Sequence, residues 1–331
     1  MNKLMINKNT ILLYVTGFIL ILIAGFRPIG IDRDSINYIS IISVNIAVAN
    51  FIDKEPGFWL IKYINDIAFN GNFRTFFLMF AIMGVSLKIF AIKKYSLTIT
   101  LSVFAYICLY FILHEMTQIR VGVSAGIFLI ALEDIKNKRL KAYLIKMIFA
   151  MMFHYSAILM LLVYFINPYK INLKLFFLLP ILGILFAIIK DSNLNIFLNI
   201  LNILPEFISN KIKFYIQLQK DNKYSDINIL NLYYLSLIII YYFSLSNYKK
   251  MKSEYDLIFI KILGITLFSF YFFSFLPVLA FRVSEFFGIV LIFLIPHISL
   301  SIKEKTIVNF LIITWLFNYF IFIMIMKNLN L

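Results

Sequence analysis

The sequence is poor in cysteine, in histidine and in charge. Its 331 residues include one cysteine and three histidines, and only 14% of them are charged. The single cysteine, Cys108, excludes an internal disulfide, and no cysteine and histidine cluster has the spacing of a metal site. The scarcity of charge excludes an ordinary soluble domain, in which about a quarter of the residues are charged.

Long apolar runs are abundant instead. Hydrophobic residues make up 62% of the chain, and the mean hydropathy is +0.92. Runs of about 18 apolar residues recur from end to end, and each can cross a bilayer as a helix. They lack the apolar and polar alternation of outer-membrane strands. The sequence therefore predicts an all-α polytopic integral membrane protein with about 10–11 transmembrane helices.

Charge between the apolar runs predicts their orientation. Lysine-rich loops separate several runs, and the positive-inside rule places these loops and the N-terminus in the cytoplasm. Lys3 and Lys8 precede the first run without a small-residue cleavage site, which predicts an uncleaved first span. The predicted spans are residues 10–26, 73–92, 97–113, 117–133, 143–166, 173–189, 227–245, 257–275, 278–300 and 306–326.

Simple alternation of these spans conflicts with the lysines of 246–256, which would then lie outside. An extra crossing at 192–208, whose asparagines recur at helical spacing, resolves the conflict. The alternative is an interfacial helix there and one wrongly assigned span nearby. This topology places two longer segments outside, residues 27–72 and roughly 192–226. No repeat or linker is visible, so residues 1–331 are predicted to form a single transmembrane domain.

Arginine and lysine are distributed unequally between the two faces. The predicted cytoplasmic loops carry lysine and one arginine, Arg139, whereas the other arginines lie on or near the outer face. The guanidinium group suits bidentate recognition of phosphate or carboxylate. These residues predict an anionic substrate of the outer leaflet, such as a lipid pyrophosphate; chance and interfacial anchoring are the alternative. They are Arg27, Arg33, Arg74, Arg120 and Arg282.

Arg120 belongs to the polar stretch HEMTQIRVG, which begins at His114 between two predicted spans. It precedes Glu133, expected at the cytoplasmic boundary, by about 19 Å of helix at ~1.5 Å per residue. The hydrocarbon core is about 30 Å thick, so Arg120 lies below the outer interface. An arginine at that depth requires a wet or protein-lined cavity. The stretch, with Glu115 and Gln118, therefore predicts the mouth of such a cavity.

Three stretches resemble the EpsG/Wzy-type bacterial polysaccharide polymerases, which include O-antigen polymerases. They occur in the family's order and spacing, and cover about two thirds of the chain. The stretches are FRPIGIDRDSINYIS (26–40) followed by EPGFWLI (55–61), QIRVGVSAGIFLIAL (118–132) followed by FAMMFHYSAILML (149–161), and LAFRVSEFFGIVLIFLIP (279–296). Residues 190–226 lack the family's pattern.

The resemblance implies a glycosyltransferase with a GT-C-like helical bundle at the outer face of the bacterial inner membrane. Such enzymes move a growing glycan from one undecaprenyl pyrophosphate carrier onto the repeat unit of the next, without a cofactor or an obligatory metal. The expected partners are undecaprenyl-pyrophosphate-linked oligosaccharide and membrane lipids, with a chain-length regulator protein as a further candidate. Nucleic acid is not expected, because cytoplasmic lysines explain the net charge of +15.

Glycosyl transfer from a pyrophosphate needs two kinds of group. Preorganised positive charge stabilises the leaving group, and Arg120, Arg282 and Arg27 are the predicted ligands. A general base must reach the acceptor hydroxyl. The candidates are Asp32, His114 and Glu115, and the predicted supporting residues are Arg33, Gln118, Glu285, His154 and Tyr38.

Each of these residues also has a structural interpretation. Asp32 in GIDRD can cap a turn, and His114 and Glu115 can be solvated at the interface. His154 lies within a predicted span, where pairing with a neighbouring helix is the favoured role. Arg120 can be paired structurally, Glu285 can neutralise Arg282 three residues before it, and Arg27 can anchor the chain at the interface. Tyr38, Trp59 and Tyr63 on the external segment can stack on sugars.

Two other functions fit the same residues. An O-antigen ligase has the same arginine chemistry and another acceptor. A transporter or flippase of lipid-linked oligosaccharides also carries ionisable residues in its spans. The absence of an inverted repeat and of paired broken helices in the sequence pattern argues against transport.

Overall fold

The computed structural model describes residues 8–32, 34–43, 55–189, 206–220 and 227–328. The described residues form helices and no strand, which confirms the all-α class. Each of the predicted spans falls on one or two of these helices. Residues 192–205 of the proposed crossing at 192–208 lie outside the described residues. The chain divides into two compact units, which are described separately.

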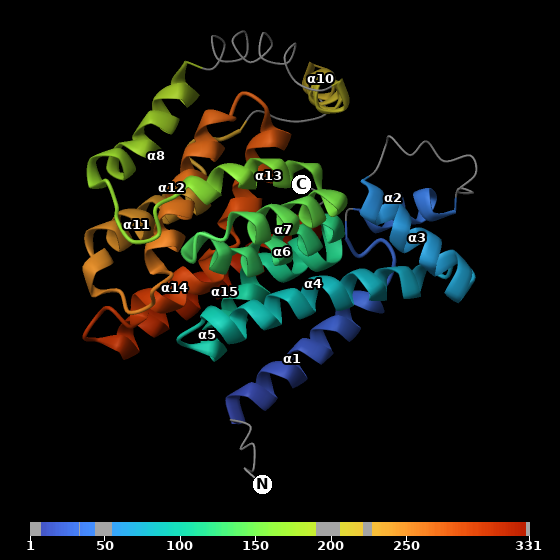
Figure 1. Cartoon of the computed structure of the whole chain (residues 1–331), viewed down its shortest axis with the longest axis horizontal. Helices are drawn as coiled ribbons and strands as arrows, with labels where there is room; N and C mark the ends of the chain where they lie inside the picture. Colours follow the sequence, from blue (N-terminus) through green and yellow to red (C-terminus); the bar gives the residue numbers. More distant parts are fainter. Residues whose placement is uncertain (1–7, 33, 44–54, 190–205, 221–226, 329–331) are drawn as a thin grey trace. The chain divides into compact units, whose positions relative to one another are not determined.

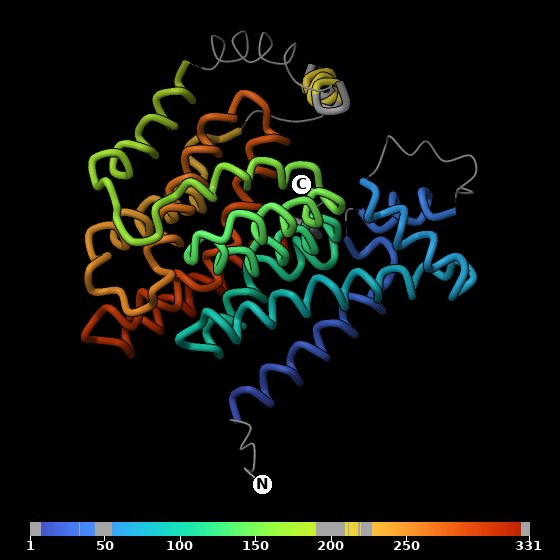
Figure 2. The backbone as a smooth tube through the Cα atoms, viewed as in Figure 1, coloured from blue at the N-terminus to red at the C-terminus, as the bar shows by residue number. Residues whose placement is uncertain are grey.

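The first unit comprises Met1–Ile166, Met251–Tyr255 and Leu291–Leu331. Its chain path is shown in Figures 1 and 2. The helices are α1 (Lys8–Gly25), α2 (Ser35–Ile42), α3 (Pro56–Phe69), α4 (Phe73–Tyr95), α5 (Ile99–Tyr106), the π-helix η2 (Ile107–Thr117), α6 (Ile119–Lys136), α7 (Leu140–Phe153), the 3₁₀-helix η3 (Tyr155–Phe165), α14 (Leu291–Ser299) and α15 (Lys305–Asn328).

Helix α4 is the centre of this unit, with α1 on one side and α6 on another. Small residues allow the close packing: a Cβ atom on Gly17 of α1 would lie 2.9 Å from Ile89, and one on Gly126 of α6 would lie 2.7 Å from Leu87. Gly122 and Gly126 form a GxxxG step in the sequence, a pattern that permits such close packing against another helix. α1 runs antiparallel to α4 and α6 runs parallel to it, as alternating spans require.

Four described helical segments are long and apolar enough to cross a membrane: α1, α4, the continuous helix Ile99–Thr117 and α15. α13 (Pro277–Gly288) and α14 pass the same test together, while η3, α8 (Leu173–Ile188) and α11 (Leu232–Ser246) are apolar but shorter. The predicted span at 143–166 is interrupted, because α7 ends at Phe153 and η3 begins at Tyr155. The chain is thus an all-α multi-pass membrane protein with several broken or short helices.

Acidic residues at one end of α6 bind the cations of the predicted cytoplasmic loops. Lys94, at the end of α4, pairs with Glu133. Arg139 Nε lies 3.0 Å from Asp134 Oδ1, and Lys146 pairs with the same carboxylate. The structure therefore gathers these loops at a single end of the α4 and α6 pair, as the charge pattern predicts. His297, in the last turn of α14, is buried, and its Nε2 accepts the Leu97 N–H at 3.0 Å.

The second unit comprises Asn167–Lys250 and Asp256–Val290. Its helices are α8 (Leu173–Ile188), α10 (Glu206–Lys220), α11 (Leu232–Ser246), the short η4 (Tyr248–Lys250), α12 (Asp256–Phe272) and α13. α12 is central and packs against α8, α11 and α13. Buried Lys261 of α12 donates to the carbonyls of Asn167 and Lys170. α10 packs through Ile212 and Ile216 against the turn that precedes α13.

Candidate functional site

Buried charged side chains gather in the first unit where α1, α3, α4, η2 and α6 approach one another. They lie around a cluster of aromatic rings that includes Tyr38, Phe58 and Phe77. Charges removed from water are costly unless they are paired, so each of them needs a partner. The charged and histidine residues are Arg27, Asp32, Glu55, Lys88, His114, Glu115, Arg120 and His154.

Arg27 follows α1 and is bound into the protein. Its Nη1 donates to the Ala24 carbonyl at 2.6 Å and its Nη2 to the Met116 carbonyl at 2.7 Å. The guanidinium carbon lies 4.1 Å from the centroid of the Phe77 ring. Arg27 is buried, which differs from the alternative in which it anchors the chain at the interface. The interaction with Met116 ties the end of α1 to the end of η2.

Asp32 is the partner of Arg27 and caps a turn. Its Oδ2 accepts Arg27 Nε at 2.9 Å. Its Oδ1 accepts the backbone N–H groups of Asp34 at 3.1 Å and Ser35 at 2.8 Å, at the start of α2. Asp32 therefore has the turn geometry that GIDRD allows. The Asp32 carboxylate thus accepts three hydrogen bonds, one of them from an arginine.

Arg120 lies in the first turn of α6 and pairs with Glu55, which immediately precedes α3. Glu55 Oε1 lies 3.4 Å from His154 Nδ1. The side chain of Glu55 is fully buried, whereas 15% of the Arg120 side chain is exposed. Arg120 Nε has no hydrogen-bond partner among the described residues. The arginine is thus fixed through one terminal nitrogen and retains donor capacity for a ligand.

Gly57 explains how Glu55 reaches His154. A Cβ atom at Gly57 would lie 2.7 Å from the Met152 carbonyl oxygen, so glycine lets the start of α3 touch the end of α7. α7 then ends at Phe153, and His154 has an extended backbone with φ −154° and ψ 115°. The break between α7 and η3 therefore turns His154 toward Glu55. The sequence predicts such helix pairing for His154.

Glu115 and His114 lie in the last turns of η2, and the prediction that they form a solvated mouth between two spans is wrong. They are 2% and 0% exposed. Glu115 pairs with Lys88 of α4 and accepts the Tyr106 hydroxyl at 3.0 Å. The helix extends to Thr117 because Lys88 and Tyr106 satisfy a carboxylate that otherwise requires water. Gln118 forms the turn, where its N–H donates to the Leu113 carbonyl at 2.6 Å.

His114 is enclosed by η2 and its neighbours. Its ring lies 5.0 Å from the Tyr110 ring, centroid to centroid. Neither ring nitrogen has a hydrogen-bond partner in the part of the chain that the structure describes. Tyr38 is also buried, and packs 6.1 Å from the Phe58 ring and 6.3 Å from the Phe77 ring. Tyr38 is therefore part of the aromatic core, which does not fit the predicted stacking on sugars.

Three predicted residues lie elsewhere. Arg33 is outside the described residues. Arg282 and Glu285 are on α13 of the second unit, where Arg282 Nη1 donates to the Tyr215 hydroxyl of α10. The Arg282 guanidinium carbon also lies 5.1 Å from the Tyr215 ring centroid. This contact joins α10 to one of the predicted pyrophosphate ligands.

The sequence reasoning missed Glu55 and Lys88. Glu55 begins the stretch EPGFWLI, where a Glu before Pro-Gly is typical of a helix start, but no feature of the sequence names its partner. Lys88 is a single cation inside the apolar run of α4. An ionisable residue within a span is a candidate site residue by position alone, so this signal was available.

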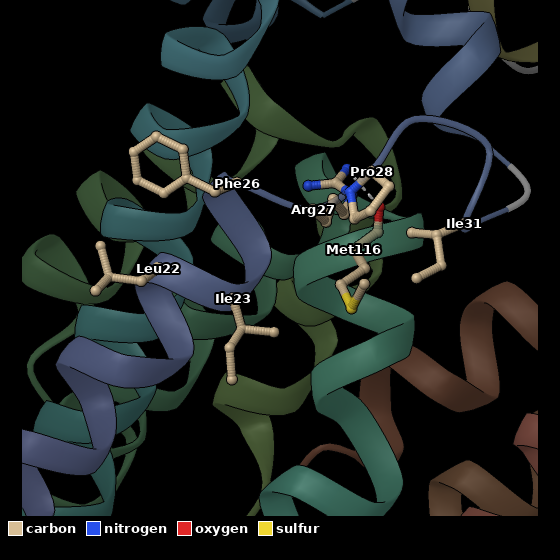
Figure 3. Close-up of a pocket in the computed structure, with 7 residues that line it drawn as sticks. All are labelled: Leu22, Ile23, Phe26, Arg27, Pro28, Ile31 and Met116. Atoms are coloured by element: carbon tan, nitrogen blue, oxygen red, sulfur yellow. Dashed lines mark hydrogen bonds between the residues drawn. The ribbon is translucent and has the colours of Figure 1, made fainter.

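A shallow groove lies beside Arg27 on the surface of the first unit (Figure 3). It has a volume of about 500 Å³. Apolar side chains from the end of α1 and from the following loop line it, together with Met116. The lining residues are Leu22, Ile23, Phe26, Arg27, Pro28, Ile31 and Met116.

Gly84 of α4 makes room for the Glu115 carboxylate, since a Cβ atom there would overlap Glu115 Oε2. We expect Gly84→Ala to lower the free energy of unfolding by about 1–3 kcal/mol, the usual cost of overpacking a core. The thermal midpoint of the purified protein in detergent measures this loss. Ser86→Ala, on an exposed position of the same helix, should leave the midpoint unchanged. An unchanged midpoint for Gly84→Ala would contradict this packing.

The model of the EpsG family matches residues 10–330, which is nearly the whole chain and includes every described residue of the buried cluster. No curated protein and no solved structure matches the chain. The chain belongs to the EpsG family, a family of Wzy-type polymerases.

Proposed function

We propose that the protein is an O-antigen or exopolysaccharide polymerase that joins undecaprenyl-pyrophosphate-linked repeat units at the outer face of the inner membrane. Membership of the EpsG family supports a polysaccharide polymerase. The observation that carries the finer proposal is the buried group of Arg120, Glu55 and His154. Arg27 borders the same aromatic cluster through Phe77, as Arg120 does through Phe58 at 5.9 Å.

The arginines stabilise the leaving group. The acceptor hydroxyl attacks the anomeric carbon of the donor, a new glycosidic C–O bond forms, and the bond to the pyrophosphate oxygen breaks with its electron pair. The negative charge that develops on the pyrophosphate is neutralised by Arg120, with Arg27 nearby. Fixed positive charge in a site of low polarity lowers this barrier more than it would in water. Arg33 is the proposed support, and Arg282, on the second unit, stays a prediction from the sequence.

His154 is the proposed general base, with Glu55 behind it. The imidazole takes the proton of the acceptor hydroxyl, and the Glu55 carboxylate, 3.4 Å from Nδ1, stabilises the imidazolium that forms. Asp32 and Glu115, the other predicted bases, are each held by a cation and by further hydrogen bonds. His114 is a proposed second proton acceptor and Gln118 a proposed supporting residue, whereas Glu285, on the second unit, stays a prediction from the sequence.

The groove beside Arg27 is the proposed binding site for the isoprenoid chain of the carrier. An apolar chain with a pyrophosphate head matches an apolar groove that ends at an arginine. We expect Ile23→Trp to fill the groove and to raise KM about tenfold for a full-length carrier, through lost apolar burial, while KM for a carrier with a short prenyl chain stays unchanged. KM is measured by chain elongation in detergent.

Ile19→Trp is the matched control for the groove, because Ile19 is an exposed position of α1 outside it. It should leave both KM values unchanged. Equal KM changes for long and short carriers in Ile23→Trp would contradict the groove assignment.

Deletion of the gene separates the polymerase from its rivals. Loss of a polymerase leaves single repeat units attached to the final acceptor, whereas loss of a ligase abolishes attachment. Loss of a flippase leaves lipid-linked units at the cytoplasmic face. Attached single units are the expected result, with ladders restored by the intact gene. Either of the other two outcomes would overturn the proposal.

A further inference from the structure

A further buried ion pair lies at the junction of η2 and α6, beyond the residues that bind substrate in the proposed function. Lys88 of α4 is fully buried. Its ammonium group pairs with Glu115 and also donates to the Gly122 carbonyl at 2.5 Å. Glu115 precedes the turn at Gln118, and Gly122 follows it. One lysine therefore holds the chain on both sides of the turn.

Both proposed pyrophosphate arginines depend on this turn. The Met116 carbonyl, one residue after Glu115, accepts Arg27 Nη2 at 2.7 Å. Arg120 lies between the turn and Gly122, on the first turn of α6. A shift of the backbone here would move Arg120 and release Arg27 from its acceptor. Lys88 of α4 thus holds the turn on which the placement of both arginines depends.

The surroundings of the ion pair are shaped to hold it. Tyr106 donates to the same Glu115 oxygen that Lys88 binds. A Cβ atom at Gly84 or at Gly122 would overlap Glu115 or the His114 carbonyl. A buried ion pair adds little stability over apolar residues of the same size, and fixing one arrangement is its better attested use. The ion pair therefore fixes the position of the turn at Gln118 more than it stabilises the folded protein.

We propose that Lys88 is a positioning residue that, with Glu115 and Tyr106, fixes the turn at Gln118 and sets Arg27 and Arg120 to the spacing of a pyrophosphate. This inference rests on the proposed function. It assigns a role to Lys88 and changes the role of Glu115 from a base to a positioning carboxylate.

The test uses the full-length protein and two inhibitors of chain elongation. One is inorganic pyrophosphate, and the other is the free oligosaccharide repeat unit without pyrophosphate. The Lys88→Met/Glu115→Gln double variant removes both charges and retains the side-chain volumes. We expect its Ki for pyrophosphate to rise about tenfold, as small misplacements of binding groups do, and its Ki for the oligosaccharide to stay unchanged. A role in folding alone would move both constants or neither.

The matched control is Lys261→Met, which removes another buried lysine that binds backbone carbonyls, in the second unit. It should change neither Ki. Tyr106→Phe removes a single hydrogen bond and serves if the double variant does not fold; its Ki for pyrophosphate should rise about threefold. An unchanged pyrophosphate Ki, or an equal rise for both inhibitors, would overturn the positioning role.

Hydrogen exchange separates this inference from the proposed function. If the wild-type protein elongates no glycan, the proposed function fails, and exchange of the amides of 116–122 still tests the turn. The wild type should protect them, and the double variant should exchange them about tenfold faster by local opening. Equal exchange rates in the two proteins would contradict the positioning role of Lys88, whatever the result of the elongation assay.

Discussion

Arg120→Ala should abolish polymer formation, with turnover reduced by about a thousandfold or more, since one lost charge-stabilising donor costs roughly 3–4 kcal/mol of the barrier. Removal of the arginine also leaves Glu55 buried without its cation, so some loss of stability is expected. The measurement is the length of polymer ladders in cells that lack the native gene. Full-length ladders would overturn the assignment of Arg120.

Two further variants separate chemistry from folding at this position. Arg120→Lys keeps the charge and the partner of Glu55 but lacks the planar fork that grips phosphate, so ladders should be short but present. Arg139→Ala removes an arginine from the opposite end of the same unit, where 49% of its side chain is exposed. It should produce normal ladders. Protein levels are compared by blotting a terminal tag in each strain.

Glu55→Gln should have the second largest effect. Glutamine keeps the shape and a hydrogen bond to Arg120, but its neutral amide cannot stabilise an imidazolium at His154. Turnover should fall about a hundredfold, near the lower range of a lost general base, while KM changes little. Purified protein and lipid-linked repeat units give the two constants. Because the two residues act as a unit, His154→Asn should cost about as much, and the double variant little more.

Glu133→Gln is the control for Glu55→Gln, because Glu133 also pairs with cations but at the lysine-rich end of α6. It should retain normal turnover. Turnover of Glu55→Gln within threefold of the wild type would show that His154 works without its carboxylate, and would remove this pair from the mechanism.

The sequence predicts the helical class well because apolar runs and lysine-rich loops are local signals. Each described span falls at its predicted place, and the lysines of neighbouring loops meet the acidic end of α6. The sequence also predicts Arg120 as a candidate site residue, because depth along a helix follows from a residue count. The partner of Arg120 is not predictable in this way. Glu55 comes from a segment far away in sequence, and only tertiary packing brings it to Arg120 and His154.

For the stretch around His114, the sequence-based prediction of the local structure is wrong. A run of polar residues between two apolar runs is typical of a loop, so the sequence predicts the solvated mouth of a cavity there. The structure continues the helix through it, because Lys88 and Tyr106 satisfy Glu115 inside the protein. Burial of a charge depends on a counter-charge on another helix, which sequence periodicity does not reveal. Lys88 within an apolar run is the only local hint.

The most direct test of the account is elongation by the purified protein in liposomes that contain one substrate, the undecaprenyl-pyrophosphate-linked repeat unit. No ion gradient, nucleotide or nucleotide sugar is added. The account predicts glycans that grow in whole repeat units, with one undecaprenyl pyrophosphate released for each bond formed, and no growth with Arg120→Ala. Substrate that crosses the bilayer without growing longer, or wild-type protein that leaves it unchanged, would contradict the account.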